Sequence, residues 1–238
     1  SDQICIADKS PEKLAQLKSQ HQIEVKGIAA IGNSCNVIFL AVKPQDLADV
    51  LNELKRTIQP ETVVISIAAG KTIKFIEDQL QTNNPVIRAM PNTPAQIGKG
   101  ISAIAVGAKV SGDELKIATK LFSTTGEVVV VTEDKIDAVT ALSGSGPAYF
   151  FYFIEAMVKA GVELGLTDEI ASKLAIETIS GSAAMLKESN LDAATLRKNV
   201  TSPKGTTAAA LEVFSNNDLE NIIFKAMSAA KNRAQELA

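Results

Sequence analysis

Histidine and cysteine are scarce in this sequence. Its 238 residues contain one histidine, His21, and two cysteines, Cys5 and Cys35. One histidine excludes a multi-histidine metal site, and a His-dependent catalytic triad is not expected. The cysteines form no Cys-x-x-Cys pattern and lie in apolar, strand-like surroundings, so we expect buried, reduced thiols in a cytoplasmic protein. If the chain is an enzyme, its chemistry comes from an organic cofactor rather than from a metal.

Long apolar runs and concentrated positive charge are also missing. The most apolar run, 148–154, is stopped by Glu155 and is far too short to span a bilayer. The net charge is −3, and Lys and Arg are scattered, so we expect neither a nucleic-acid nor a membrane partner. The first residues do not form a secretory signal. A hydrophobic content of 46% is typical of a globular protein of one large or two modest domains.

The first half of the chain alternates strand and helix patterns. Helices are predicted to begin at Ser10-Pro11, at Pro44, near Ile73 and at the capping box Ser111–Glu114. Strands are predicted at 4–7, 23–25, 37–42, 62–66, 86–88, 101–106 and 127–131. This alternation predicts an α/β domain with a parallel, doubly wound (Rossmann-like) sheet over residues 1–131.

After about Thr132 the strand pattern stops. The predicted helices are 133–141, 146–165, 167–188, 192–199 and 206–236. Residues 132–238 are therefore expected to form an all-α domain.

Three loops follow predicted strands at the edge where doubly wound sheets bind ligands. They are Asp8-Lys9-Ser10, Ala41-Val42-Lys43-Pro44 and Ala68-Ala69-Gly70. In the first, an acidic residue is suited to a ribose 2′-hydroxyl and a basic residue to a 2′-phosphate. Each loop alone is as well explained by an ordinary turn, but together they predict a nucleotide site.

Two small-residue segments, 137–149 and 199–207, precede helical patterns in the second half. The free N–H groups at a helix start can hold an anion. In the first segment an interhelical turn with Ser145 as cap explains Ser145 and Pro147 but not both nearby glycines. In the second, the backbone N–H groups of Gly205, Thr206 and Thr207 are candidates for binding a carboxylate, with Lys204 adding a charge. Capping alone is the alternative.

The stiff loop from Arg88 to Pro94 places Asn92 between two prolines. It is interpreted either as a rigid turn in which Asn92 bonds its own backbone or as a ligand contact.

These motifs, in this order and spacing, resemble those of the pyrroline-5-carboxylate reductase family. The strings are DAVTALSGSGPAYFF, RAMPNTPAQIGKG, AVKP, SIAAG and NVTSPKGTT. The resemblance covers essentially the whole chain. It implies reduction of a cyclic imine, 1-pyrroline-5-carboxylate, to proline with NADPH, or NADH as the other coenzyme. It also implies a homodimer formed by the helical domain, often assembled further into a decamer.

The resemblance assigns roles residue by residue. Thr140 lies near the imine nitrogen, where either Thr140 or water supplies the proton. The implied cofactor contacts are Lys9 and Ser10 at the adenosine ribose, Ala41, Val42, Lys43, Pro44, Ala68 and Ala69 along the nicotinamide and pyrophosphate, and Asn199. The implied substrate contacts are Glu133, Gly205, Thr206 and Thr207.

The sequence departs from the family pattern in several places. The family begins with a strand and a GxGxxG-type turn, whereas this chain starts at what resembles the second strand. We therefore expect an unpaired sheet edge, and poor folding or weak cofactor binding by these 238 residues. Lys204 stands where the family often has Gly, and Ile28 stands near the position of a cofactor-contacting Asn. Asp8 beside Lys9 opposes the preference for NADPH that Lys9 favours.

Two other functions stay open at this point. One is a related imine reductase or hydroxyacid dehydrogenase, for which Lys135 and Lys159 are catalytic candidates by location only. The other is an inert oligomeric binding protein.

Overall fold

The computed structural model describes residues 4–237. Contacts between Cα atoms divide the chain into two compact units. The α/β unit comprises the residues up to Gly144 and those from Ala230 onward, and the helical unit is Ser145–Ala229. The division follows Gly144 rather than Val131 because residues after the last strand still pack on the sheet. Ile136, for example, is 1% exposed and belongs to the core of the α/β unit.

The strands of the α/β unit form two sheets. β1 (Cys5–Ile6) pairs in parallel with β2 (Glu24–Val25). The five-stranded sheet has the order β3-β4-β5-β6-β7. Its strands are β3 (Val37–Leu40), β4 (Val63–Ser66), β5 (Val86–Met90), β6 (Gly100–Val106) and β7 (Gly126–Val130).

The α/β class is confirmed, but the sheet is not wholly parallel. β3, β4 and β5 are parallel, whereas β6 runs antiparallel to β5 and parallel to β7. The reversal follows from the connection, because β5 and β6 are joined by the short 3₁₀ helix η2 (Thr93–Ile97) and not by a crossover helix.

Six helical elements connect the described strands of this unit, in addition to η2, and three more follow β7. The connecting elements are α1 (Pro11–His21), α2 (Ile28–Ser34), η1 (Pro44–Asp46), α3 (Leu47–Leu54), α4 (Ile73–Leu80) and α5 (Gly112–Ser123). After β7 come η3 (Glu133–Lys135), α6 (Ile136–Val139) and the π-helix η4 (Thr140–Gly144). The predicted caps are confirmed: Ser10 caps α1, and Ser111 forms a capping box with Glu114 on α5. α2 was not predicted.

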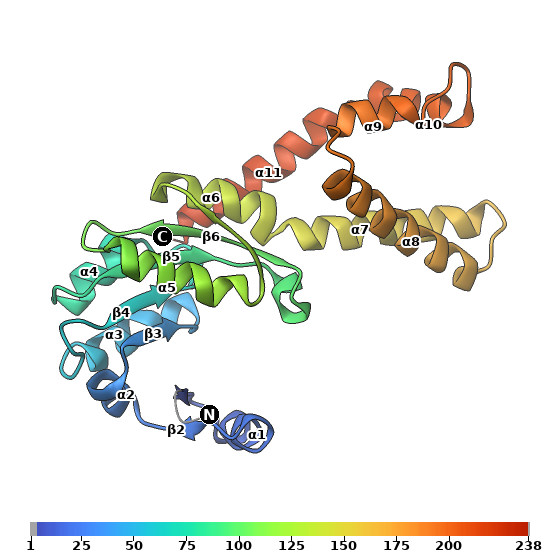
Figure 1. Ribbon diagram of the computed structural model, residues 1–238. Helices are drawn as coiled ribbons and strands as arrows, with labels where there is room; N and C mark the ends of the chain where they lie inside the picture. The colour runs from blue at the N-terminus through green and yellow to red at the C-terminus, as the bar shows by residue number, and fades with distance from the viewer. Residues whose placement is uncertain (1–3, 238) are drawn as a thin grey trace. The chain divides into compact units, whose positions relative to one another are not determined.

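The five-stranded sheet has a core on each face (Figure 1). The first core contains Val64 and Val86 of the sheet, and α3, α4 and α6 pack against it. The second core contains Ile65 and Ile87, and α5 packs against it through Ala118 and Phe122. Neighbouring residues on one strand therefore face opposite cores, as strand geometry requires.

β3 lies at the edge of the five-stranded sheet and has no hydrogen-bonded partner on its outer side among the described strands. Phe39 on β3 remains 43% exposed, although its ring meets that of Phe122 edge-on with centroids 5.6 Å apart. This agrees with the expected unpaired edge. β1 and β2 form a two-stranded sheet that lies, with α1, apart from the five-stranded sheet (Figure 1).

The helical unit confirms the predicted all-α character. Its helices are α7 (Gly146–Glu163), α8 (Asp168–Glu188), α9 (Ala193–Asn199), α10 (Thr206–Asn216) and α11 (Leu219–Glu236), the last of which ends in the α/β unit. The single helix expected over 206–236 is broken at Asn217-Asp218, where Asp218 has a φ of 55°. No helix within residues 4–237 is long and apolar enough to cross a membrane.

Candidate functional site

The loops after β3 and β4 lie side by side at one edge of the sheet. Leu40 and Ser66, the last residues of the two strands, are paired in register. Ala41 and Lys43 are exposed, while Val42 packs against the first core and Pro44 begins η1. After β4, Ala68 is 5% exposed and Ala69 is half-buried. Small side chains thus line this edge, as the nucleotide-site hypothesis requires.

The loop after β1 is tied to the loop after β3 by an ion pair. The Lys9 ammonium lies 2.8 Å from the Asp46 carboxylate on η1, and this hydrogen bond raises the pKa of Lys9. Ser10 begins α1, with its hydroxyl accepting from the Lys13 N–H and donating to Glu12. Two of the three predicted loops are therefore brought together by a contact that sequence reasoning did not foresee.

Gly70 completes the loop after β4 in a conformation that favours glycine. Its φ is 78°, and a Cβ there would lie 2.7 Å from the Leu237 carbonyl oxygen. The end of the described chain is therefore packed against one of the predicted cofactor loops.

Thr140 begins the π-helix η4, which runs to Gly144. Single π-helical turns are rare and occur frequently at functional sites. The Thr140 hydroxyl donates to the Ile136 carbonyl over 2.8 Å. Because this bond uses its only proton, Thr140 can donate to a ligand only after its O–H bond turns away from the Ile136 carbonyl.

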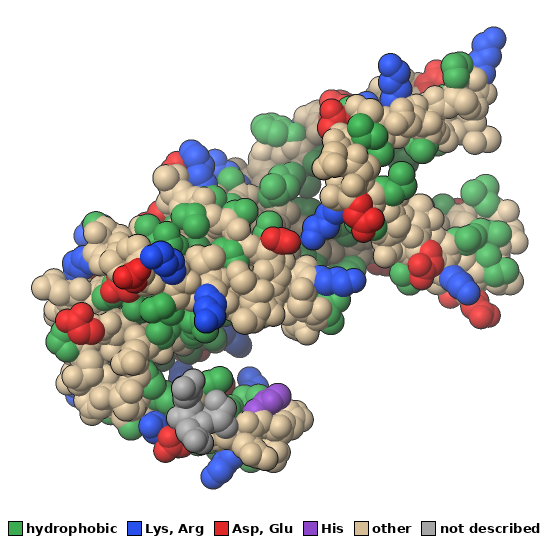
Figure 2. Space-filling view, viewed as in Figure 1, with side chains coloured by type: hydrophobic (Ala, Val, Ile, Leu, Met, Phe, Trp, Pro, Cys, Tyr) green, Lys and Arg blue, Asp and Glu red, His purple; other side chains and the backbone are tan. Residues whose placement is uncertain are grey.

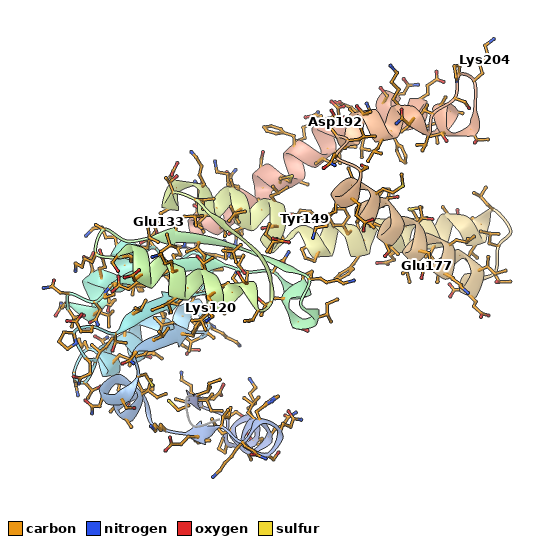
Figure 3. The ribbon with its side chains drawn as sticks, in the orientation of Figure 1. Lys120, Glu133, Tyr149, Glu177, Asp192 and Lys204 are labelled. Atoms are coloured by element: carbon orange, nitrogen blue, oxygen red, sulfur yellow. The ribbon has the colours of Figure 1, made fainter. Side chains whose placement is uncertain are left out.

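Glu133, the predicted substrate contact on η3 (labelled in Figure 3), binds other parts of its own unit. Its Oε1 accepts the Ile73 N–H over 2.7 Å, at the start of α4. The same oxygen lies 3.4 Å from Nη1 of Arg88 on β5, and Nη2 of Arg88 lies 3.4 Å from the Asp137 carboxylate. The structure thus gives Glu133 a helix-capping and charge-pairing role.

Asn92 belongs to the stiff loop after β5. Its side-chain oxygen accepts the N–H of Ile101 over 3.0 Å, so it fixes the start of β6. This bond differs from the one to its own backbone that the rigid-turn alternative supposed, because the loop folds back on the next strand. The rigid-turn interpretation of this loop is supported by a different bond.

Gly205, Thr206 and Thr207 lie in the helical unit, at the start of α10. Of the three amides predicted to bind a carboxylate, that of Gly205 donates to the Ser202 carbonyl over 3.0 Å, so a ligand would have to replace or share this bond. Gly205 also permits a tight turn, since a Cβ there would lie 2.4 Å from the Ser202 hydroxyl. Thr206 and Thr207 occupy the first turn, where amides have no partner within the helix, and no side chain caps it.

Asn199 is the exposed last residue of α9 in the same unit. An open pocket of about 480 Å³ lies beside it, with Arg197, Lys198, Thr201 and Leu211 among its lining residues. Neither Asn199 nor Gly205, Thr206 and Thr207 line this pocket. The predicted site residues therefore divide between the units, with Asn199 and 205–207 in the helical unit and the others in the α/β unit.

The segment that contains Ser145 differs from the expected interhelical turn. Ser145 stands at the start of α7, but its side chain makes no capping bond. The chain runs through η4 into α7, and Gly144 faces β5, since a Cβ at Gly144 would lie 2.5 Å from Cε of Met90. Close packing accounts for the first of the two glycines.

Cys5 and Cys35 are half-buried free thiols rather than fully buried ones. Their Sγ atoms lie 3.3 Å apart, and burial together with the Cys35 thiol raises the pKa of Cys5. Within residues 4–237, no group of three or more His, Cys, Asp or Glu side chains forms a potential metal site.

Arg88 and Asp137 are the residues that sequence reasoning missed. The available signal was an arginine inside the apolar strand 86–90, because a buried charge requires a partner of opposite sign. Asp137 begins the motif DAVTALSGSGPAYFF, but the spacing of residues in the sequence does not show that it contacts β5.

Comparisons with known proteins agree with this arrangement. The profile of the pyrroline-5-carboxylate reductase dimerisation family matches residues 133–237, and that of the NADP oxidoreductase, coenzyme F420-dependent family matches residues 1–70. Pyrroline-5-carboxylate reductase 1 of Bacillus spizizenii is 40% identical, over 99% of this chain and 80% of the relative.

Two solved structures extend the comparison. A pyrroline-5-carboxylate reductase from Coxiella burnetii has a TM-score of 0.93 at 37% identity, covering 100% of this chain and 89% of the other. The Plasmodium falciparum enzyme, solved with NADP bound, has a TM-score of 0.86 at 29% identity, covering 98% of this chain and 86% of the other. The chain belongs to the pyrroline-5-carboxylate reductase family.

Proposed function

We infer that this protein reduces 1-pyrroline-5-carboxylate to L-proline by hydride transfer from NADPH. The observation that carries the inference is the π-helix that begins at Thr140, which lies inside the stretch matched by the reductase dimerisation profile. The names of the relatives support the same reaction. No observation favours a hydroxyacid dehydrogenase, since Lys135 is exposed and paired with Asp134 over 2.6 Å.

The edge of the α/β unit fits a dinucleotide. Ala41, Ala68 and Ala69 leave the ends of β3 and β4 free of long side chains, so a flat ring can approach the backbone. Lys9 places a cation at the end of β1 that is suited to a 2′-phosphate, and Ser10 adds a hydroxyl. Lys43, Val42 and Pro44 complete the proposed cofactor contacts, together with Asn199 from α9.

The chain's own residues are proposed to orient the imine and to protonate it. Bound NADPH supplies the hydride for the imine carbon. Thr140, or a water it holds, supplies the proton to the imine nitrogen, and the amides of Thr206 and Thr207 bind the carboxylate. Orientation of this kind can supply several kcal/mol of the barrier reduction. Glu133 contributes by holding its neighbours, and Gly205 contributes by shaping the turn before α10.

The assembly is part of the same proposal. The dimerisation profile supports a homo-oligomer, for which we propose a homodimer that assembles further into a decamer. A cytoplasmic location also stays a prediction, in keeping with the two free thiols.

Oxidation of NADPH at 340 nm with 1-pyrroline-5-carboxylate tests the reaction. From folded protein that binds NADPH, we expect substrate-dependent oxidation and formation of proline. Folded protein that binds NADPH without turning it over contradicts the reductase function and favours a binding protein. A stable protein that reduces other cyclic imines but not this one favours a related imine reductase.

The preference for NADPH over NADH is expected to depend on the ion pair between Lys9 and Asp46, because Asp46 competes with a 2′-phosphate for the Lys9 ammonium. Lys9→Ala removes a charge-assisted bond, which is worth about 1.5–3 kcal/mol, so the ratio of kcat/KM for NADPH over NADH should fall by about 10- to 100-fold. Asp46→Asn releases Lys9 and should raise the same ratio. An unchanged ratio in both variants removes Lys9 from cofactor recognition.

A further inference from the structure

Arg88 is a buried charge for which the proposed reaction has no direct use. It lies in the middle of β5, opposite Ser66 of β4 and Ala105 of β6, and its side chain is only 5% exposed. A buried guanidinium is costly unless charged partners surround it. The carboxylates that Arg88 binds should therefore explain why an arginine is buried in this strand.

Both partners of Arg88 come from one short stretch of chain. Nη1 lies 3.4 Å from Glu133 and Nη2 lies 3.4 Å from Asp137, one helical turn later. Glu133 also accepts the N–H of Ile73, which fixes that carboxylate to the start of α4. The guanidinium thus binds the chain at Glu133 and at Asp137, both shortly before Thr140.

β5 also contacts the far end of the same stretch. Met90 lies two residues after Arg88, on the same face of the strand, and its Cε lies where a side chain on Gly144 would go. The π-helix from Thr140 to Gly144 is therefore bounded by contacts with β5 on both sides. A π-helix is an uncommon backbone geometry, and it persists when its surroundings fix it.

We infer that Arg88 is a positioning residue, which holds the π-helical segment so that the Thr140 hydroxyl stands at the place where the imine nitrogen is protonated. The inference rests on the proposed function of Thr140. Arg88 acts through Asp137 and Glu133. Loss of these contacts lets the segment shift, and a displacement of about 1 Å can reduce turnover by about 100-fold.

Arg88→Met and Asp137→Asn test this inference, with Asn84→Ala as the matched control. Asn84 is 1% exposed and donates to the carbonyls of Gln59 and Thr62, so its loss weakens the same unit without touching the π-helical segment. Hydrogen exchange of amides 136–144 is measured on the protein without ligands. Then kcat, the KM for the imine and NADPH binding are measured well below the melting temperature.

We expect Arg88→Met to speed exchange over 136–144 and to lower kcat by about 100-fold, with KM and NADPH binding changed less than about threefold. Arg88→Lys, which keeps the charge, should recover part of kcat. Asn84→Ala should lower the melting temperature and leave kcat and the exchange of 136–144 unaltered.

If Arg88→Met does not fold, Asp137→Asn carries the test, because it leaves Arg88 paired with Glu133. Unaltered exchange and kcat in the folded variants overturn the inference. Equal losses of kcat in Asn84→Ala and Arg88→Met overturn it too, because they would show that Arg88 affects kcat only through the stability of the α/β unit. An inactive wild-type protein refutes the proposed function instead, while the exchange data still show whether Arg88 holds the segment.

Discussion

At the residue scale, the Thr140 hydroxyl has a hydrogen-bond partner of its own, which the proposed reaction has to replace. It donates to the Ile136 carbonyl, within its own turn of helix. The exchange of this bond for one to the substrate is nearly neutral in free energy, because one hydrogen bond replaces another. The O–H bond can turn from one acceptor to the other while the rest of the side chain stays in place.

Thr140→Ala tests whether this hydroxyl supplies the proton. Positioned proton donors contribute about 100-fold or more to the rate, so kcat should fall by about that factor with little change in KM. Thr140→Ser keeps the hydroxyl and should retain most of the activity. Steady-state kinetics with saturating NADPH measures both. Full activity in Thr140→Ala assigns the proton to water.

Gly70 is a second residue whose role can be isolated, because Gly98 is a matched control. Both have a positive φ, 78° at Gly70 and 69° at Gly98, but only Gly70 is packed against Leu237. An alanine at Gly98 should cost about 1 kcal/mol of backbone strain. An alanine at Gly70 should cost about 1–3 kcal/mol more, because it overlaps the Leu237 backbone.

Chemical unfolding of the two alanine variants measures this difference. Equal destabilisation of the two variants would show that Leu237, which follows α11, moves away from the loop at no cost.

At the scale of single elements, the α9 helix is capped by a group that titrates. The Asp192 carboxylate accepts the N–H of Thr195 over 2.7 Å, and this bond lowers the pKa of Asp192 below its ordinary value of 3.8. A depressed pKa means that the cap stabilises the helix fully above the ordinary value. The contribution is lost as the pH falls through the lower, folded-state value.

The amide proton shift of Thr195, followed by NMR during acidification, measures this loss. We expect the shift to move as the pH falls below 3.8 and to stay constant in Asp192→Asn, whose cap does not titrate. The Ile170 amide, which is capped by the Thr167 hydroxyl at the start of α8, is the control within the same molecule. A Thr195 shift that is independent of pH rules out the cap as the pH-sensitive contact.

The elements that the sequence predicts well are those with a local physical cause. The buried runs 37–40 and 63–66 are strands, and the capping box at Ser111 begins a helix. α2 escapes prediction because its first turn follows Gly27 without a side-chain cap. The break at Asp218 and the π-helix also escape prediction.

The sequence predicts those parts of the candidate site that consist of short local motifs. The small residues at 41 and 68–69 are visible in the sequence, and they lie at the expected edge. The pairing of Lys9 with Asp46, and of Arg88 with Glu133 and Asp137, joins residues far apart in the chain. Only the fold brings such residues together.

At the scale of the whole molecule, the first turns of α7 cannot be buried by the helical unit alone. Five consecutive aromatic residues, 149–153, point around the helix in all directions, and Phe151 is 69% and Tyr152 is 73% exposed. Much apolar surface on the chain is exposed in the same way (green in Figure 2). Surface of this kind marks an interface, as expected for a chain that matches a dimerisation profile.

Phe151→Ser should therefore weaken self-association. The loss of a central aromatic contact typically costs about 2 kcal/mol or more, which raises the dissociation constant of the homo-oligomer by about 30-fold. Sedimentation equilibrium measures this constant. Ile97→Ser, which removes an equally exposed apolar side chain from η2, should leave it unchanged. An identical effect of the two substitutions would place the interface elsewhere.

Alternate residues of β5 have two different roles. Ile87 and Ala89 face the α5 core, whereas Arg88 and Met90 face the segment with Thr140. A mutational scan of residues 87–90 should consequently separate by position, with substitutions at 87 and 89 lowering the yield of folded protein and substitutions at 88 and 90 lowering turnover. Natural variation at 88 and 90 is then constrained by chemistry, and that at 87 and 89 by packing, within one five-residue strand.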